Sequence, residues 1–201
     1  MNTTSRDIID YWLGCTNDPD SALGKRDLWY RGGREVDNEI EAQFGKLVRE
    51  ICNGGYTFWE SDTEDALALV IVLDQFTRNL YRGTPNAYCG DARALRISND
   101  IVNARNHIGL SVPSQIFLFH PFHHSENLSE QNQGIDLLSE LQKRATVEWH
   151  SYIQKCIDGF RGHRDIVAEF GRFPHRNNVL KRQNTRAEEL YLAQNPARFG
   201  Q

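Results

Sequence analysis

The stretch from His163 to Asn177, HRDIVAEFGRFPHRN, concentrates more potential chemistry than any other part of the chain. Two histidines, three arginines, an aspartate and a glutamate alternate there with phenylalanines, a glycine and a proline. Arginine forks bind carboxylates and phosphates, and a histidine exchanges protons near neutral pH. A proline in the first turn of a helix leaves backbone N–H groups that attract anions. The stretch therefore predicts a polar cleft for an anion, with Arg172, His175, Arg176 and Asn177 in its wall.

The triplet His163-Arg164-Asp165 matches the start of a kinase catalytic loop, but the rest of that motif is missing. Phe170 stands where the loop needs an asparagine, and the chain has neither the glycine-rich loop nor the Asp-Phe-Gly motif. Kinase chemistry is therefore excluded. The alternative to an anion site is a structural knot of buried ion pairs. Such a knot joins Arg172 and Arg176 to Asp165, Asp91 or Glu126.

The segment 120–126, HPFHHSE, holds three histidines and one carboxylate. Its spacing fits no metal-binding motif, and we predict neither a metal nor another cofactor. Pro121 is expected to end a helix, so that His120 and His124 do not share one helical face. His124 is then better suited to act as a general acid or base, with Glu126 at the start of the next helix.

A third polar group follows the most apolar run of the chain. Asp74, Arg78 and Arg82 are four residues apart and lie along one face of a helix, with Gln75 and Asn79 on the neighbouring face. These residues either reach a ligand or form an exposed helix end with one intrahelical ion pair. In both cases the helix dipole, which is negative at the C-terminus, favours basic residues there.

Helical spacing of apolar residues dominates the elements that must position these groups, and no segment alternates like a strand. The run Ala66–Leu73 is apolar on all sides, which predicts a helix buried almost completely. Ser5, Ser61 with Glu64, and Thr185 with Glu188 are expected to cap helices. We predict an all-α fold, an antiparallel array of about 8–10 helices in one domain over residues 1–201. The expected helices cover 5–13, 36–52, 61–82, 87–106, 114–120, 129–143, 147–157, 164–170, 174–181 and 185–193.

Composition excludes several classes of protein. A net charge of −4 argues against a general nucleic-acid binder, which needs a basic surface. The longest apolar run is too short to span a membrane, and the N-terminus lacks the pattern of a signal peptide. The four cysteines contain no CxxC pair and are interpreted as reduced, mostly core-filling thiols. We therefore expect a cytoplasmic protein without membrane or nucleic-acid partners.

Several strings together resemble one family. They are ALVIVLDQFTRNLYRGT, then Tyr88 with Asp91-Ala92, then PF-x-HSE, then HRDIVAEFGRFPHRN. In these the chain resembles the bacterial domain of unknown function 924 family over nearly its whole length. The resemblance implies an all-α fold related to tetratricopeptide-like right-handed superhelices, and it implies no particular reaction. His120 and His123 look like additions of this chain, and Thr77 replaces an expected proline, which predicts an unkinked helix there.

The first functional hypothesis is a cleft for a small anionic molecule, in which the three polar segments lie within about 15 Å of one another. Whether the site is enzymatic is left open. The expected acid–base groups are His124, Glu126 and His175. The expected ligand-binding residues are Asp74, Gln75, Arg78, Asn79, Arg82, Asp91, His163, Asp165, Arg172, Arg176 and Asn177.

The second hypothesis is a tetratricopeptide-like module that binds a peptide or a protein in a groove. The same polar residues then form a buried network that only stabilises the fold. In that case the arginines are saturated by ion pairs and no cavity adjoins them.

Overall fold

The computed structural model describes residues 3–15, 19–30 and 33–194. These ranges contain helices and no strand, which confirms the all-α prediction. The tetratricopeptide-like superhelix and the single domain stay predictions. The α-helices are α1 (Ser5–Leu13), α2 (Pro19–Gly24), α3 (Arg26–Tyr30), α4 (Arg34–Cys52), α5 (Thr63–Ile71), α6 (Thr77–Leu80), α7 (Asp91–Asn103), α8 (Val112–His124), α9 (Leu128–Arg144), α10 (Val147–Phe170) and α11 (Arg186–Gln194). Shorter turns are η1 (Thr57–Ser61), η2 (Val72–Phe76), η3 (Pro85–Tyr88), η4 (Asn106–Gly109) and η5 (Pro174–Arg176).

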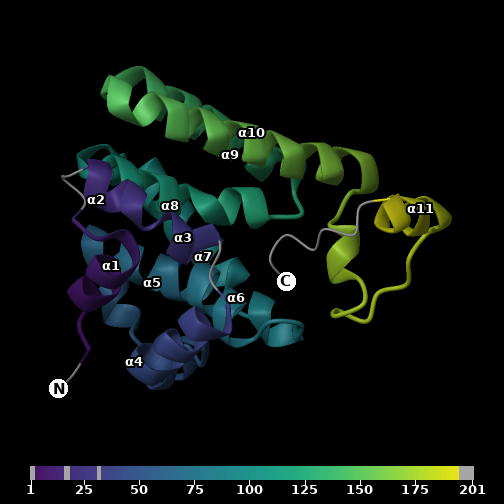
Figure 1. The fold of residues 1–201 in the computed structure, drawn as a ribbon, viewed down its shortest axis with the longest axis horizontal. Coiled ribbons are helices and arrows are strands. Elements are labelled where there is room, and N and C mark those ends of the chain that lie inside the picture. The colour runs from purple at the N-terminus through teal and green to yellow at the C-terminus, as the bar shows by residue number, and fades with distance from the viewer. Residues whose placement is uncertain (1–2, 16–18, 31–32, 195–201) are drawn as a thin grey trace.

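The helices are arranged as a stack of antiparallel neighbours (Figure 1). The two longest late helices, α9 and α10, run side by side along one edge of the molecule, joined by a short connection. Helix α8 packs against α9 and α10, and α5 packs against α8, α7 and α1. None of the helices in the described ranges is long and apolar enough to cross a lipid bilayer.

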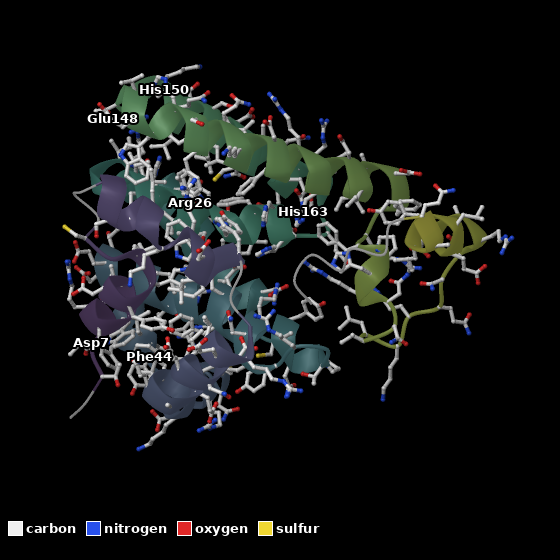
Figure 2. All side chains as sticks on the ribbon, viewed as in Figure 1. Asp7, Arg26, Phe44, Glu148, His150 and His163 are labelled. Atoms are coloured by element: carbon white, nitrogen blue, oxygen red, sulfur yellow. The ribbon has the colours of Figure 1, made fainter. Side chains whose placement is uncertain are left out.

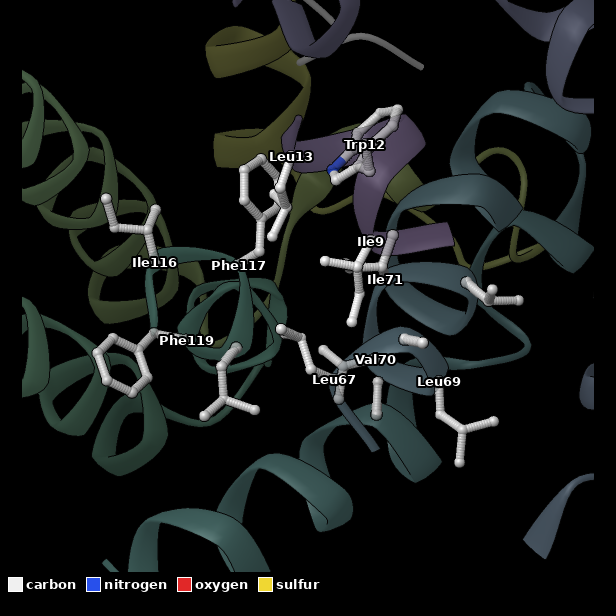
Figure 3. Packing of buried hydrophobic residues seen from close by; sticks show 14 of the residues in the cluster. Ile9, Trp12, Leu13, Leu67, Leu69, Val70, Ile71, Ile116, Phe117 and Phe119 are labelled. Atoms are coloured by element: carbon white, nitrogen blue, oxygen red, sulfur yellow. The ribbon is translucent and has the colours of Figure 1, made fainter. Parts of the chain in front are cut away.

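The core is centred on α5, as its apolar run predicts. Every residue from Ala66 to Ile71 is buried. One face of α1, including Trp12, packs against α5, and α8 packs against α5 as well (Figure 3). The ring of Trp12 lies 5.4 Å from that of Phe76 and 6.0 Å from that of Phe117, measured between centroids. This packing fixes the ends of α5 and α8, where the polar residues lie.

Two of the three predicted helix caps lie one residue away from the residue that caps the helix. Thr4, rather than Ser5, caps α1 in a capping box with Asp7. Asp62, rather than Ser61, caps α5 and accepts hydrogen bonds from the first turn. Each neighbouring pair holds two good N-cap residues, and sequence alone does not choose between them. The third box, Thr185 with Glu188, is confirmed by its two reciprocal hydrogen bonds of 2.7 and 3.2 Å.

The helix that starts with α5 is not regular along its length. Between Val72 and Phe76 it widens into a π-helical turn, η2, in which the N–H of Thr77 bonds the carbonyl of Val72. In a regular α-helix the Leu73 carbonyl would accept from the backbone N–H of Thr77. Here the Thr77 hydroxyl donates to that carbonyl at 2.8 Å instead. The helix is therefore not a regular α-helix just before Thr77, and the expectation that it is unkinked at this position stays a prediction. Such bulges are rare and are frequent at functional sites.

Helix α8 continues through Pro121 to His124, so the predicted end at residue 120 is wrong. Pro121 costs one backbone hydrogen bond, but the residues around it are almost all buried in the core. Tertiary packing therefore outweighs the local cost. As a result His120, His123 and His124 lie on successive turns of one helix end.

Helix α10 runs unbroken from Val147 to Phe170, where two helices were expected. Gly159 and Gly162 do not interrupt it, because Phe160 and its apolar neighbours hold it against α8 and α9. The helix ends at Gly171, whose φ of 69° is left-handed. The predicted helix 174–181 is only the short turn η5.

Candidate functional site

A buried carboxylate and a histidine lie at the centre of the polar region. Asp74, on the π-helical turn, is completely buried. One of its oxygens is 2.6 Å from Nδ1 of His124, at the end of α8, and the other accepts a 2.6 Å hydrogen bond from Gln75. We place the shared proton on Nδ1, which leaves Nε2 of His124 as a proton acceptor. This is the geometry of an oriented general base.

Burial sets the protonation of this pair. It raises the pKa of Asp74, against the opposing charges of Arg78 and Arg176. Burial together with the charge of Arg78 lowers the pKa of His124 well below its usual value. His124 is therefore a neutral imidazole near neutral pH, and its side chain is 17% exposed.

Two guanidinium groups and one carboxylate adjoin the pair. Arg78 donates to both oxygens of Asp91 at 2.8 and 2.9 Å, and to the Ala87 carbonyl. Nη1 of Arg176 lies 3.6 Å from Asp91. The ring of Tyr88 packs against both arginines, with centroid distances of 4.6 and 4.8 Å. Together with the carboxylate of Asp74, which both arginines also attract, the two cations and two anions have no net formal charge.

Arg176 is less well neutralised than Arg78. Its residue is only 6% exposed, and its Nε–H is buried without a hydrogen-bond partner in the part of the chain that the structure describes. Burial, reinforced by the charge of Arg78, lowers its pKa. Burial also raises the pKa of Asp91 to about 6, in spite of Arg78 and Arg176. An unsatisfied buried donor is unusual and is expected where a ligand normally supplies the acceptor.

The turn after α10 is fixed by Glu126, which therefore does not orient His124. One oxygen of Glu126 accepts from the backbone N–H of Phe173 at 2.9 Å. Arg182 donates to both Glu126 oxygens at 2.6 and 2.9 Å, and to the Asn177 side chain at 2.9 Å. Burial raises the pKa of Glu126, but these hydrogen bonds outweigh it and the net shift is downward. Sequence reasoning missed Arg182, whose signal was its place at the end of a segment, residues 161–182, that is rich in lysine and arginine.

Other predicted site residues form separate pairs. Arg82 and Asn79 both donate to Asp37 on α4, at 2.9 Å each. Arg172 binds both oxygens of Glu188 at 2.7 and 2.8 Å, and so anchors α11. These arginines are engaged in ion pairs that stabilise the fold.

Of two more residues in the 163–177 stretch, one lies inside the molecule and the other points to solvent. Asp165 points to solvent with a side chain 67% exposed, and pairs with Arg164 at 2.9 Å. His175 lies inside, with a ring centroid 5.5 Å from that of Phe173, and burial lowers its pKa to about 3. His175 thus faces the polar region, and Asp165 does not.

A row of histidine rings links the pair to a cavity. The centroid of His123 is 4.1 Å from that of His124, 4.5 Å from that of His163 and 5.1 Å from that of His120. Both ring nitrogens of His123 lack a hydrogen-bond partner within the described ranges. Burial and the neighbouring His124 lower the pKa of His123 well below its usual value. These rings are therefore neutral and packed on one another.

The cavity encloses about 620 Å³ between α3, α8 and α10. Arg26 contributes to its lining from α3 (Figure 2). His120 and His123 form the inner wall of the cavity. Its remaining polar lining includes Asp27, Tyr30, Tyr152, Lys155 and Cys156. Within the described ranges no group of three or more histidine, cysteine, aspartate or glutamate side chains is arranged to hold a metal ion.

The three polar segments thus meet, through the contacts of Asp74 with His124 and of Glu126 with Phe173, and through Asp91, which lies between Arg78 and Arg176. A family model described as a bacterial protein of unknown function, DUF924, matches residues 8–196. The chain belongs to the DUF924 family. A solved structure of a protein of unknown function from Agrobacterium tumefaciens is 29% identical, with a TM-score of 0.77, over 94% of this chain and 97% of the other. No curated protein matches the sequence.

Within this DUF924 chain, the elements that meet at Asp74 are also the strings that carry the family resemblance. The π-helical turn supplies the carboxylate of Asp74, the end of α8 supplies His124, and η5 supplies Arg176. The arrangement can hold an anion and exchange a proton with it.

Proposed function

We propose that the chain binds a small anionic molecule and exchanges a proton with it at Nε2 of His124. The observation that carries this proposal is the completely buried Asp74, hydrogen-bonded at 2.6 Å to the neutral His124. Asp74 orients the imidazole, as the carboxylate partner of a catalytic histidine does. The reaction class is proton transfer to or from a bound carboxylate-bearing or phosphate-bearing substrate.

Arg176 is the group that we assign to the anion. It is buried, its Nε–H has no partner among the described residues, and its charge acts on both Asp74 and His124. A bound carboxylate or phosphate would accept a hydrogen bond from that donor. Arg78 is a positioning residue in this proposal, because its donors are already used by Asp91 and Ala87.

The adjoining cavity gives the body of the ligand a place. Its volume of about 620 Å³ falls in the range of pockets for metabolites. Arg26 and Lys155 at its lining favour an anion, and its wall at His123 touches the ring of His124.

The alternative is a peptide-binding or protein-binding module with a structural polar network. It is favoured by the saturated pairs of Arg82 with Asp37 and of Arg172 with Glu188. In this alternative Arg176 contributes only to folding.

A thermal-shift series separates the two functions. Inorganic phosphate, mono- and dicarboxylates and phosphate monoesters are added to the wild type, to Arg176→Gln and to Arg186→Gln, each beside its neutral amide or alcohol analogue. Arg186 is an exposed arginine paired with Glu189, and it controls for loss of a positive charge. The proposal expects at least one anion to stabilise the wild type and Arg186→Gln, but not Arg176→Gln. It is wrong if no anion shifts the wild type, or if Arg176→Gln responds equally.

A further inference from the structure

Two cysteines that are 37 residues apart in sequence lie side by side in the fold. The Sγ atoms of Cys52, at the end of α4, and Cys89, directly after η3, are 3.4 Å apart. Cys89 is exposed and Cys52 is half-buried, so small molecules in solution reach the pair. The expectation of mostly core-filling thiols holds for the buried Cys156 but not for Cys89 or the exposed Cys15.

The backbone on both sides of the pair is held in place. Arg93 donates to the carbonyl of Ile51, next to Cys52, at 3.0 Å and so ties α7 to the end of α4. Gly90, next to Cys89, packs directly on the backbone of Leu73, where an added Cβ would lie 2.3 Å from the Leu73 carbonyl oxygen. The two thiols therefore stay neighbours. A disulfide needs its sulfurs about 2.05 Å apart, which small side-chain rotations from 3.4 Å provide.

The contact makes the two thiols chemically unequal. The hydrogen bond between Cys89 and Cys52 lowers the pKa of Cys89 to about 7, against the effect of burial, and the charge of Arg78 adds to the lowering. The same hydrogen bond raises the pKa of Cys52. Cys89 is therefore the thiol that attacks first, and Cys52 is the one that resolves the product.

We propose that Cys52 and Cys89 form a redox-active dithiol that low-molecular-weight disulfides oxidise to an intramolecular disulfide. The Cys89 thiolate attacks one sulfur of the disulfide RSSR, which gives a mixed disulfide and releases RS⁻. Cys52 loses its proton to solvent and attacks Sγ of Cys89, which releases the second RS⁻. In sum two protein thiols lose two electrons and two protons, and RSSR becomes two RSH. This modification site is independent of the proposed anion site.

The new bond would join the end of α4 to the segment that carries Tyr88 and Asp91. That segment supplies the ring against which Arg78 and Arg176 pack. Oxidation therefore tethers one wall of the polar region and leaves its charged groups chemically unchanged.

The test uses the reduced full-length chain with oxidised glutathione at pH 7, followed by alkylation and peptide mapping. We expect wild type and Cys15→Ser to yield a peptide pair linked through Cys52 and Cys89, reversed by dithiothreitol. Cys52→Ser should stop at a glutathione adduct on Cys89. The proposal is overturned if the wild type carries only glutathione adducts, or if Cys89 links to another cysteine. Peptide mapping of the wild type decides the matter even if a variant folds poorly.

A rate measurement tests the order of attack. At pH 7 a thiol with a pKa of about 7 is half ionised, against about 3% for an ordinary thiol with a pKa of about 8.5. Lower intrinsic nucleophilicity offsets part of this gain, so the net advantage is about threefold. Cys52→Ala, which removes the hydrogen bond, should slow glutathionylation of Cys89 by about threefold, whereas Cys52→Ser should not. Equal rates in all three proteins would refute the assigned roles.

Discussion

His163→Gln should remove a large part of the acid sensitivity of this protein. The ring of His163 is packed between those of His123 and Phe173, at centroid distances of 4.5 and 5.2 Å. Burial lowers its pKa from 6.5 to about 4, against the hydrogen bond to the His123 carbonyl and with help from the charge of Arg176. The folded state therefore holds a proton on His163 more weakly than the unfolded chain does.

The magnitude follows from proton linkage. A fall of the pKa from 6.5 to about 4 corresponds to about 3 kcal/mol, because each pH unit is worth about 1.4 kcal/mol. This stability is fully present above pH 6.5, is lost as the pH falls towards 4, and changes no further below that. The other buried histidines act in the same direction, and Asp91, whose pKa burial raises to about 6, acts in the opposite one. The effect of His163 alone is therefore obtained by comparing the free energy of unfolding of the wild type with that of a variant that lacks this histidine.

The assay is urea denaturation followed by tryptophan fluorescence at pH values between 7 and 4. Glutamine keeps an N–H donor for the His123 carbonyl and has no proton to gain in this range. We subtract the free energy of unfolding of His163→Gln from that of the wild type at each pH. This difference should fall by about 3 kcal/mol between pH 7 and pH 4. His150→Gln, on the exposed side of α10, controls for the replacement itself (Figure 2). A difference that stays constant across the whole pH range would refute the reasoning.

Three further predictions use the same denaturation assay at pH 7. Gly90→Ala should cost about 3 kcal/mol, because the new methyl group would collide with the Leu73 carbonyl, and a loss below 1 kcal/mol would contradict the close contact. Thr77→Val should cost about 1–2 kcal/mol, because the Leu73 carbonyl loses the hydroxyl that satisfies it, and Thr77→Ser should restore most of the loss. Glu126→Gln should cost about 2–3 kcal/mol through the weakened bonds from Arg182 and Phe173, and should leave the anion-dependent thermal shift in place.

The sequence predicted the fold class and the meeting of the three polar segments, because both follow from local patterns. The all-round apolar run at 66–73 specified a buried helix, and the positions of the polar residues at helix ends brought them together. The continuity of helices through Pro121 and Gly159 was not predictable in this way. A proline or glycine inside a helix destabilises it by about 1–3 kcal/mol, and burial against helices distant in sequence offsets this cost.

The partners of the arginines were the other part that sequence reasoning could not supply. Arg172 was expected to line the cleft and instead anchors α11 through Glu188. Glu126 was expected to act as an acid or base beside His124 and instead binds Arg182. Any of several carboxylates would neutralise an arginine equally well, and only tertiary contacts decide which of them does.

The π-helical turn at 72–76 also governs how the chain tolerates change in length. Such a turn is equivalent to one residue inserted into an α-helix, and each residue advances a helix by about 100°. The widened turn absorbs its extra residue locally, so the helical segments before and after it keep the register of one continuous helix. Deleting one residue of this turn other than Asp74 would therefore give a regular helix in which Arg78 still faces Asp91 and Arg82 still faces Asp37. A deletion in the regular part of α5 has no such slack, and would rotate every later residue of the helix by about 100°. The polar region therefore tolerates a one-residue deletion in the turn better than one in α5.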